Sequence, residues 1–594
     1  MCFGQGVRMS LLFSSVVFFL ISACVLVRAS SESFPRNDPL RRNQVVARFS
    51  ARTQRVLAVR EGGSWFASAK PRLHQDDVAI ALYVNSSMTK SNFGTLEVVT
   101  NGQYSDEEQM WAAGYLEGFV TAQEIAQQYA NLHSYFVSTM GADLEKPMEW
   151  IRAQDEWVRR MCRDENKKHD DGFWVAVCLV LQQFDGVVQG YQAFRDERPD
   201  LVPAIHYHDF LFLESNADLY DVIDAFDPNQ RPSWNVSKTD KTPAQMLNEL
   251  ALEQSKCSAL VTFSADVSEL YMGHSTWDSY TAMLRIYKHY SFDLSFRPAG
   301  AQMSFSSYPG EIFSDDDFYL LSSQMVLLQT TNKIFNGNLF DKVLETNQVV
   351  LSWQRVRAAN LLAESGKEWA RIFSKENSGT YNNQYMVIDL KSFDQKKISK
   401  GLLTIIEQIP GLVMHDDATD ILTLAGYWPS YNIPYFKEIY QQSGYPDFSD
   451  ISKDSEYYDA LVWLSYTSAP RANIFRRDHA AVDSIQAMQA LMRRNNFKND
   501  PLTKGNPIMA VCGRGDLSID APETRGCYDT KVTSSNLAAE FAAYAVNGPT
   551  TDGGLPPFSW NPDDPQIHQG HPSVFDFSFE LMQPVKTTSF HTVV

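Results

Sequence analysis

Apolar runs separated by turn signals predict buried strands in the first quarter of the chain. Residues 78–84 are almost continuously apolar, and residues 96–100 form a second run that ends at the turn pair Asn101-Gly102. Residues 105–108 then read Ser-Asp-Glu-Glu, which has the spacing of a helix capping box. The pattern therefore predicts two strands followed by a long helix.

The same kinds of pattern continue toward the carboxyl end. A candidate hairpin has strands at 258–264 and 269–274, joined by residues 265–268. The remaining predicted elements are strands at 302–306, 324–330 and 385–390 and helices at 356–373 and 478–493, with Asp478 as the cap of the last helix. Groups of strands flanked by long helices indicate a layered α/β or α+β fold.

Residues 226–256 interrupt this regular pattern. They begin with the loop signature Asp-Pro-Asn-Gln-Arg-Pro at 227–232, continue through polar residues, and contain only a short helical pattern at 246–252. We expect an exposed connector that leads directly into Cys257.

The amino terminus has the pattern of a secretory signal peptide over residues 1–29. Residues 10–27 carry no charge and are mostly apolar, Arg8 precedes them, and the residues that follow predict cleavage near Ala29. A signal anchor is the alternative, because the run approaches the length that spans a membrane. No later run reaches about 18 apolar residues, so we expect no stable membrane insertion of the mature chain.

The net charge restricts the classes of binding partner, and the glycosylation sequons indicate the compartment. The chain has 594 residues, with 52 Lys and Arg against 71 Asp and Glu, and a net charge of −19. Such an acidic balance argues against nucleic acid as a partner and against constitutive adsorption to anionic lipid. Two N-glycosylation sequons, beginning at Asn85 and Asn235, suit a lumenal protein, and disulfides are allowed in that compartment.

Seven cysteines are present, of which two lie in the predicted signal peptide. The other five include two pairs that would each close a loop of about 15 residues, Cys162 with Cys178 and Cys512 with Cys527. Four cysteines allow three connectivities, so spacing alone does not settle the pairing. The short-loop pairing leaves Cys257 single, and a single thiol in an oxidising compartment is either buried and inert or kept for chemistry.

Motifs of several common enzyme classes are absent from the sequence. It has no G-x-S-x-G turn of serine esterases, no H-E-x-x-H or C-x-x-C motif, and no Gly-rich phosphate loop. We expect no cofactor. The carboxylate clusters at 315–317 and 415–417 lack calcium-loop spacing and are predicted as solvated loops. The Arg-Gly-Asp triplet at 514–516 is predicted as a turn inside a disulfide loop.

Cys257 lies at the start of the candidate hairpin. If the turn is centred on Ala265 and Asp266, Cys257 pairs with His274, and Trp277 follows just beyond. A thiol beside an imidazole is an arrangement suited to covalent catalysis. The alternative is a buried free cysteine with a structural histidine nearby.

Several blocks of the sequence resemble the phospholipase B-like family, including its lysosomal members and the insect lamina-ancestor proteins. They run in order from about residue 110 to the carboxyl end. The blocks are 113–118 (AGYLEG), 257–260 (CSAL), 273–277 (GHSTW), 377–384 (NSGTYNNQ), 431–434 (YNIP), 470–472 (PRA), 475–477 (FRR), 568–572 (HQGHP) and 575–577 (FDF).

The resemblance implies an N-terminal nucleophile hydrolase with an α+β fold, a four-layer αββα sandwich. Such proteins are made as precursors and cut just before the nucleophile, which places the cut between Lys256 and Cys257. The two associated chains, 30–256 and 257–594, would form one sandwich. The new α-amine of Cys257, with an ordinary pKa of about 7.7–8.0, would serve as the base. Lys256 departs from the small residues commoner before the cut, which would slow self-cleavage or leave it to a protease.

The resemblance also assigns further pocket residues. They are His274, Trp277, Thr330, Asn432 and Arg471. Thr331 is the alternative to its neighbour, and Asp278 is a further polar group. Asn432 matches the residue expected to hold the oxyanion. Arg471 would bind an anionic intermediate or substrate group.

As a function, the resemblance implies a hydrolase of the lysosomal lumen, or a secreted one. It would cleave a phospholipid acyl ester or an amide through an acyl-thioester on Cys257. Its partner would be a small lipid or amide substrate, and a homodimer is compatible with this assignment. The alternative is a lipid- or ligand-binding protein that retains the fold with low turnover. A serine lipase is disfavoured because the nucleophile turn is missing.

Overall fold

The computed structural model describes residues 25–28, 54–61, 64–68, 77–164, 172–238, 240–253, 256–345, 347–394, 397–519 and 522–585. Most of the predicted signal peptide therefore lies outside the described residues. Its last part forms strand β1 (Val25–Arg28), which pairs with β4 (Asp77–Val84). Cleavage near Ala29 would remove β1 from the mature chain.

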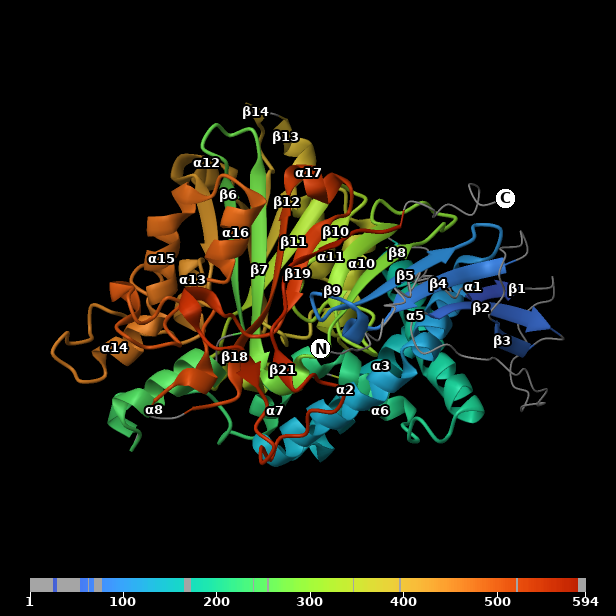
Figure 1. Cartoon of the computed structure of the whole chain (residues 1–594), viewed down its shortest axis with the longest axis horizontal. Helices are drawn as coiled ribbons and strands as arrows, with labels where there is room; N and C mark the ends of the chain where they lie inside the picture. The colour runs from blue at the N-terminus through green and yellow to red at the C-terminus, as the bar shows by residue number, and fades with distance from the viewer. Residues whose placement is uncertain are drawn as a thin grey trace, which may run out of the picture.

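Two β-sheets form the centre of the molecule (Figure 1). The larger has 12 strands, with β1 at the side of β4 and the others in the order β16 (Leu412–Asp417), β15 (Leu403–Ile409), β12 (Asn383–Asp389), β11 (Met325–Thr331), β10 (Tyr319–Leu321), β9 (Gln302–Ser307), β8 (Ile286–Ser291), β5 (Gly94–Thr100), β4, β2 (Gln54–Glu61) and β3 (Ser64–Ser68). The smaller has six, in the order β17 (Tyr427–Ser430), β6 (Cys257–Phe263), β7 (Leu270–Ser279), β18 (Arg525–Ser534), β19 (Ala543–Asn547) and β22 (Glu580–Met582). Two short ribbons complete the strands, β13 (Phe393–Asp394) with β14 (Lys397–Ile398) and β20 (Phe558–Ser559) with β21 (Val574–Phe575).

Helices cover the outer face of each sheet. Those on the larger sheet are α1 (Asp106–Val120), α2 (Ala122–Ser134), α3 (Glu145–Arg163), α5 (Phe173–Glu197), α6 (Tyr207–Glu214), α7 (Asn216–Phe226), α9 (Leu339–Leu344), α10 (Ser352–Leu362) and α11 (Gly366–Phe373). Those on the smaller sheet are α8 (Pro243–Asn248), α14 (Tyr458–Leu461), α15 (Pro470–Asp478) and α16 (Ile485–Met492). The other short helices are α12 (Thr419–Ala425), α13 (Lys437–Gln442) and α17 (Ser535–Ala539).

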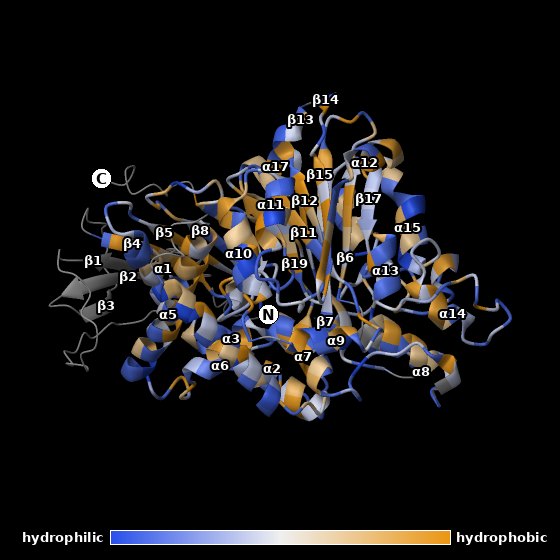
Figure 2. Ribbon diagram, turned by 180° about the vertical axis from the view of Figure 1, so that it is seen from behind, coloured by the Kyte–Doolittle hydropathy of each residue, from blue (hydrophilic) through white to orange (hydrophobic). Residues whose placement is uncertain are grey.

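Three apolar cores separate these four layers. Successive side chains of a strand point to opposite faces. On β11, Val326 packs against the smaller sheet, while Leu327 packs against the helices. On β7, Met272 faces the larger sheet and Tyr271 faces the outer helices. Figure 2 shows hydrophobic colours along the central strands β7, β11 and β12. The fold is therefore the α+β sandwich that the resemblance predicted.

The predicted capping box and the helix after it are confirmed. The Ser105 hydroxyl accepts from the backbone N–H of Glu108, whose carboxylate accepts in return, and α1 follows. Helix α1 packs on α5 through glycines of both helices. A Cβ on Gly114 would lie 1.8 Å from the carbonyl oxygen of Gln183, so this close approach requires glycine.

One described helix, α5, is long and apolar enough to cross a membrane by length and composition. Its most apolar window is 72% buried inside the protein, in the contact with α1 and the larger sheet. Burial of this kind is the pattern of a core helix.

Two predicted helices are placed differently in the structure. The helix expected over 356–373 is two helices, α10 and α11, because the chain is extended at Ala363 and Ser365 caps a new start. The helix expected over 478–493 begins at Ile485, because the Ser484 hydroxyl caps it. Asp478 instead ends α15.

Candidate active site

Both predicted disulfides are present. One joins Cys162 of α3 to Cys178 of α5, and the other joins Cys512 to Cys527 of β18. Cys257 is the free cysteine of the described residues, and its side chain is buried. Disulfides of this kind are typical of an extracellular or lumenal setting.

The hairpin that carries Cys257 has a different register from the predicted one. Cys257 pairs with Thr276, and His274 pairs with Ala259. The predicted pairing was wrong because the turn is centred one residue further along, where Val267 adopts a left-handed φ of 60°. His274 still lies on the same face of the sheet as Cys257, since residues two apart along a strand share a face.

A pocket lies at the strand end where Cys257 stands. It holds about 450 Å³ of empty space, part of it open to solvent. Of the six predicted catalytic residues, Cys257 and Trp277 line it. Thr331, the alternative to Thr330, lines it as well. Sequence reasoning missed Tyr220 on α7, which also lines the pocket, because it gave no signal beyond a helical apolar pattern.

His274 is fully buried between the sheets and is not among the residues that line the pocket. Burial lowers the pKa of its imidazole well below the usual value, and the nearby Lys531 lowers the pKa further. A neutral, enclosed ring fits a packing role behind the nucleophile. The structure therefore places His274 near Cys257 but gives it no access to the pocket.

Thr330 and Asn432 lie together behind the pocket wall. The Thr330 hydroxyl is 3.4 Å from the backbone nitrogen of Asn432, which donates to it. The side-chain amide of Asn432 donates to the carbonyl oxygen of Thr331 at 2.7 Å. Asn432 adopts a left-handed φ of 69°. Backbone strain of this kind is common at functional sites.

Arg471 holds the backbone around Cys257. Its guanidinium donates to the carbonyl oxygen of Cys257 at 2.7 Å and to the carbonyl oxygen of Tyr431 at 2.8 Å. It also lies 5.0 Å from the centre of the Trp277 ring and 4.6 Å from that of Trp463. These contacts make Arg471 a positioning group in the uncut chain.

The backbone N–H of Trp277 donates to the carbonyl oxygen of Lys256. That carbonyl precedes Cys257, so the N–H polarises the bond at which the predicted cut would occur. The indole ring belongs to the outer core on the smaller sheet. Trp277 thus offers its main chain to the reacting bond and its side chain to Arg471.

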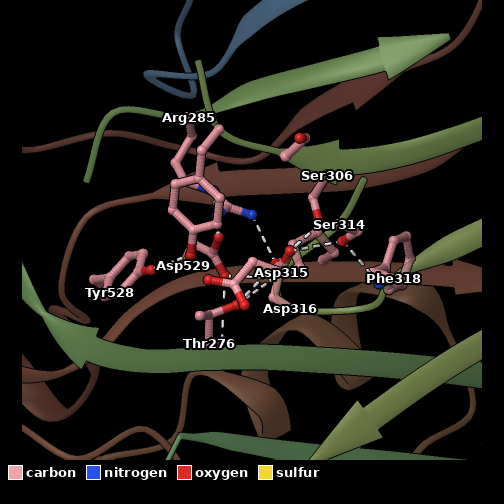
Figure 3. Close-up of polar contacts among 12 residues, drawn as sticks. Thr276, Arg285, Ser306, Ser314, Asp315, Asp316, Phe318, Tyr528 and Asp529 are labelled. Carbon is pink, nitrogen blue, oxygen red and sulfur yellow. Dashed lines mark hydrogen bonds and ion pairs between the residues drawn. The ribbon is translucent and has the colours of Figure 1, made fainter. Parts of the chain in front are cut away.

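A network of buried charges surrounds Asp316 (Figure 3), and its members Lys531 and Asp316 act electrostatically on Cys257. Asp316 accepts hydrogen bonds from Arg285 at 2.6 Å, from Thr276 at 3.0 Å and from Ser314 at 2.7 Å. Lys531 donates to Asp316 and, at 2.6 Å, to the Thr276 hydroxyl. Because Thr276 pairs directly with Cys257, the network reaches the strand position opposite the thiol.

Asp529 completes this network from strand β18. Lys531 donates to its carboxylate at 2.7 Å, and Arg285 forms an ion pair with it at 3.1 Å. Two cations therefore face two carboxylates, all of them buried. Burial raises the pKa of Asp316, but Arg285 and Lys531 outweigh it, so the pKa stays well below the usual range.

The prediction that residues 315–317 form a solvated loop is wrong. Asp316 is 1% exposed and Asp317 is 0% exposed. The cations that pair with Asp316 are Arg285, just before β8, and Lys531 on β18. Both are distant from Asp316 in the sequence, so the local pattern could not indicate the pairing. The cluster at 415–417 is exposed as predicted, but it lies at the end of strand β16 and not in a loop. The Arg514–Asp516 ion pair, at 2.6 Å, closes the predicted turn.

The thiol of Cys257 is protonated in this environment. Burial raises its pKa well above the usual value, while Lys531 opposes the shift and Asp316 adds to it. A thiol of this kind needs a base before it can attack a carbonyl.

The connector before Cys257 is less exposed than expected. Met246 and Leu250 are buried in the core on the smaller sheet, and Lys256 is 9% exposed. The short amphipathic pattern has an apolar face that is stable only when buried. Helix α8 buries its part of this face against the core on the smaller sheet. The two sequons lie at half-buried residues, Asn85 and Asn235.

The protein is therefore a layered α+β protein. Its free cysteine is the first residue of a buried strand and lines a pocket. A family model described as Phospholipase B matches residues 79–582, and the chain belongs to this family. The resemblance seen in the sequence is thereby confirmed, and the chain is a member of a family of hydrolases.

Curated relatives agree with the family assignment. Phospholipase B-like 1 of Rattus norvegicus is 41% identical over 510 residues, which cover 85% of this chain and 88% of the relative. Phospholipase-B 81 of Drysdalia coronoides is 40% identical and covers the same shares. Phospholipase B-like protein C of Dictyostelium discoideum is 37% identical over 526 residues, 86% of this chain and 88% of the relative.

Proposed function

We propose that the chain is the precursor of an N-terminal cysteine hydrolase, activated by a cut between Lys256 and Cys257. The observation that carries this proposal is the position of Cys257. It is a free thiol that lines the pocket and opens a buried strand, and the carbonyl before it accepts a hydrogen bond from the Trp277 backbone. The connector, residues 226–256, ends at the Lys256–Cys257 peptide bond, and Cys257 follows that bond.

The cut follows from ordinary thiol chemistry. The sulfur attacks the carbonyl carbon of Lys256 and gives up its proton. The nitrogen of Cys257, which becomes basic in the tetrahedral intermediate, accepts this proton as the C–N bond breaks. Water then hydrolyses the thioester, which leaves a carboxylate on Lys256 and a free α-amine and thiol on Cys257. The Trp277 N–H stabilises the oxyanion in this step, and one such donor contributes about 2.7–4 kcal/mol.

In the cut enzyme the α-amine of Cys257 takes over as base. Its pKa of about 7.7–8.0 in model compounds makes the neutral amine accessible near neutral pH. The amine takes the thiol proton as the sulfur attacks the substrate carbonyl, and it returns the proton to the leaving alcohol or amine. Water releases the acyl group from the thioester. Arg471 keeps the backbone of Cys257 in place during both steps.

The two fragments would stay together after the cut. Strand β5 precedes the cut and strand β8 follows it, and they pair in parallel within the larger sheet. The apolar core on that sheet also combines helices from both sides of the cut. Separation would expose this core to water, which opposes it.

For the substrate, the names of the relatives favour a phospholipid acyl ester, and an amide is the alternative that the same thiol chemistry allows. The lysosomal lumen or the secreted space is the compartment we propose, since two disulfides need an oxidising route of synthesis. Glycosylation at Asn85 and Asn235 belongs to this proposal.

A second candidate is a binding protein with low turnover. The observation in its favour is that Lys256 lines the pocket of the uncut chain, paired with Asp278, while burial raises the pKa of the Cys257 thiol well above its usual value. A chain that is never cut would keep both features.

The test compares the cut wild-type protein, a thiol-alkylated sample and Cys257→Ser on matched phospholipid and acyl-amide panels at acidic and at neutral pH. We expect hydrolysis by the wild type alone, with the acyl group trapped on Cys257 by rapid quenching and mass spectrometry. Activity that survives alkylation of Cys257 would overturn the thiol mechanism. Ligand binding by cut protein that hydrolyses no substrate would favour the second candidate.

A further inference from the structure

Lys256 lines the candidate pocket, and its ammonium group has two partners there. The nitrogen lies 3.6 Å from the centre of the Tyr220 ring and forms an ion pair with the carboxylate of Asp278. All three residues line the pocket together with Cys257. An aromatic face and a carboxylate together form a recognition site for an ammonium ion.

These two partners are held by contacts that do not involve Lys256. Tyr220 stands on α7, where its ring lies 4.9 Å from that of Phe136. Asp278 stands on β7, where it accepts a hydrogen bond of 2.7 Å from the backbone N–H of Ser279. We therefore expect the site to keep its shape when the lysine leaves.

The charges around the site leave room for one further cation. Arg525 pairs with one oxygen of Asp278 at 3.3 Å, and Lys256 pairs with the other. Lys333 lies 5.7 Å from the Tyr220 ring. When Lys256 departs, the oxygen of Asp278 with which it pairs loses its cationic partner and keeps only the Tyr220 hydroxyl, at 3.4 Å.

We propose that in the cut enzyme this site binds a primary ammonium group of the substrate, so that a lipid with an ethanolamine headgroup is preferred over one with a glycerol headgroup. The inference rests on the proposed cut, because only a cut chain releases Lys256 from the residue that follows it. A primary ammonium donates N–H bonds to Asp278, which the quaternary ammonium of choline cannot do. Choline lipids should therefore rank between ethanolamine and glycerol lipids.

A binding experiment tests the site without any cut. The uncut Cys257→Ala protein is compared with Cys257→Ala/Lys256→Gly, in which the site is vacated. The probes are glycerophosphoethanolamine and glycerophosphoglycerol, measured by calorimetry, with thermal melts to verify folding. We expect the vacated protein to bind the ethanolamine probe roughly five- to thirtyfold more tightly than the glycerol probe. The protein that retains Lys256 should show no such preference.

Matched variants in the vacated protein identify the groups responsible. Asp278→Asn should abolish the preference, and Tyr220→Leu should reduce it. Tyr220→Phe keeps the aromatic face and should retain it. Equal binding of the two probes by the vacated, folded protein, or a preference that Asp278→Asn leaves unchanged, would overturn the inference.

Hydrolysis by the cut wild-type protein separates this inference from the proposed function. If the protein is cut and active but does not distinguish ethanolamine from glycerol lipids, the ammonium site is refuted and the thiol mechanism stands. If the protein is never cut, the proposed function fails, and the binding experiment still decides whether the vacated site takes an ammonium ion.

Discussion

The two ends of the β6–β7 hairpin face the same larger sheet, yet they are built from opposite chemistry. Near the turn, Val261 and Met272 are 0% exposed and pack among apolar side chains of β11 and β12. At the other end, Cys257 and Thr276 lie beside the buried charges around Asp316. The residues at both ends are buried, so burial alone does not explain the difference in their chemistry.

The difference lies in what each end needs to be stable. The apolar end is stable when side chains fill its volume, and removing a buried methylene there lowers the free energy of unfolding. A charged end needs every donor and acceptor paired, because an uncompensated buried charge is costly. Cys257, the nucleophile that we propose, lies where the apolar interior meets the charged one. Changes at the two ends should therefore separate stability from reactivity.

The largest effect should come from removing a charge at the polar end. Lys531→Met leaves Asp316 and Asp529 with one cation fewer in a buried site. We expect a loss of about 3–5 kcal/mol in the free energy of unfolding, measured by chemical denaturation. The matched control is Lys400→Met, which removes an exposed ion pair with Asp420 and should leave stability unchanged. A loss no larger than that of the control would contradict the network's role.

A smaller effect should come from the apolar end. Met272→Ala opens a cavity between the sheets, and we expect a loss of about 2–4 kcal/mol in the free energy of unfolding. The cut and the hydrolysis should continue at the wild-type rate at a temperature where the variant is folded, because Met272 is not among the residues that line the pocket. Loss of cutting in folded Met272→Ala would break the proposed separation.

The smallest effect is expected in the pH dependence of stability, to which the neighbouring carboxyl groups Asp315 and Asp316 contribute in opposite directions. Burial raises the pKa of Asp315 to about 7, although Lys256 opposes the shift. The raised pKa means that its contribution to stability is complete below the unfolded value of 3.8 and is lost as the pH rises through about 7. Asp316 has a lowered pKa, so its contribution is lost only in acid, below about pH 4.

Stability of the uncut chain at about pH 5 and pH 8 checks this difference. Wild type should lose stability over this interval, and Asp315→Asn should lose less, by about 1 kcal/mol or more. The exposed Asp416→Asn serves as control and should follow the wild type. A pH dependence that is identical in Asp315→Asn and wild type would show that Asp315 does not titrate in this range.

Much of the layered fold could be predicted from the sequence, because apolar periodicity reports which side of an element is buried. The strand expected at 78–84 is β4 to within one residue, and the capping box at Ser105 begins α1 as predicted. The break at Ala363 and the cap at Ser484 were missed because several residues nearby were equally plausible caps. Element boundaries depend on local competition of that kind.

The candidate site was predicted in part. Family resemblance brought Cys257 and Trp277 to one pocket, but local pattern could not give the hairpin register, which depends on a left-handed Val267. The burial of Asp316 depends on Arg285 and Lys531, which are distant in sequence. Tyr220 reaches the pocket from α7 across the layers. Such tertiary partners leave no trace in a local pattern.

The central claim is that the Cys257 thiol performs its own release and then acts as nucleophile. The most direct measurement is the intact mass and amino-terminal sequence of purified precursor after incubation at acidic pH. We expect two associated chains in the wild type, the second beginning at Cys257, and a single uncut chain in Cys257→Ala. A Cys257→Ala protein cut at the same bond and at the same rate, or a wild-type protein that hydrolyses substrate while remaining one chain, would contradict it.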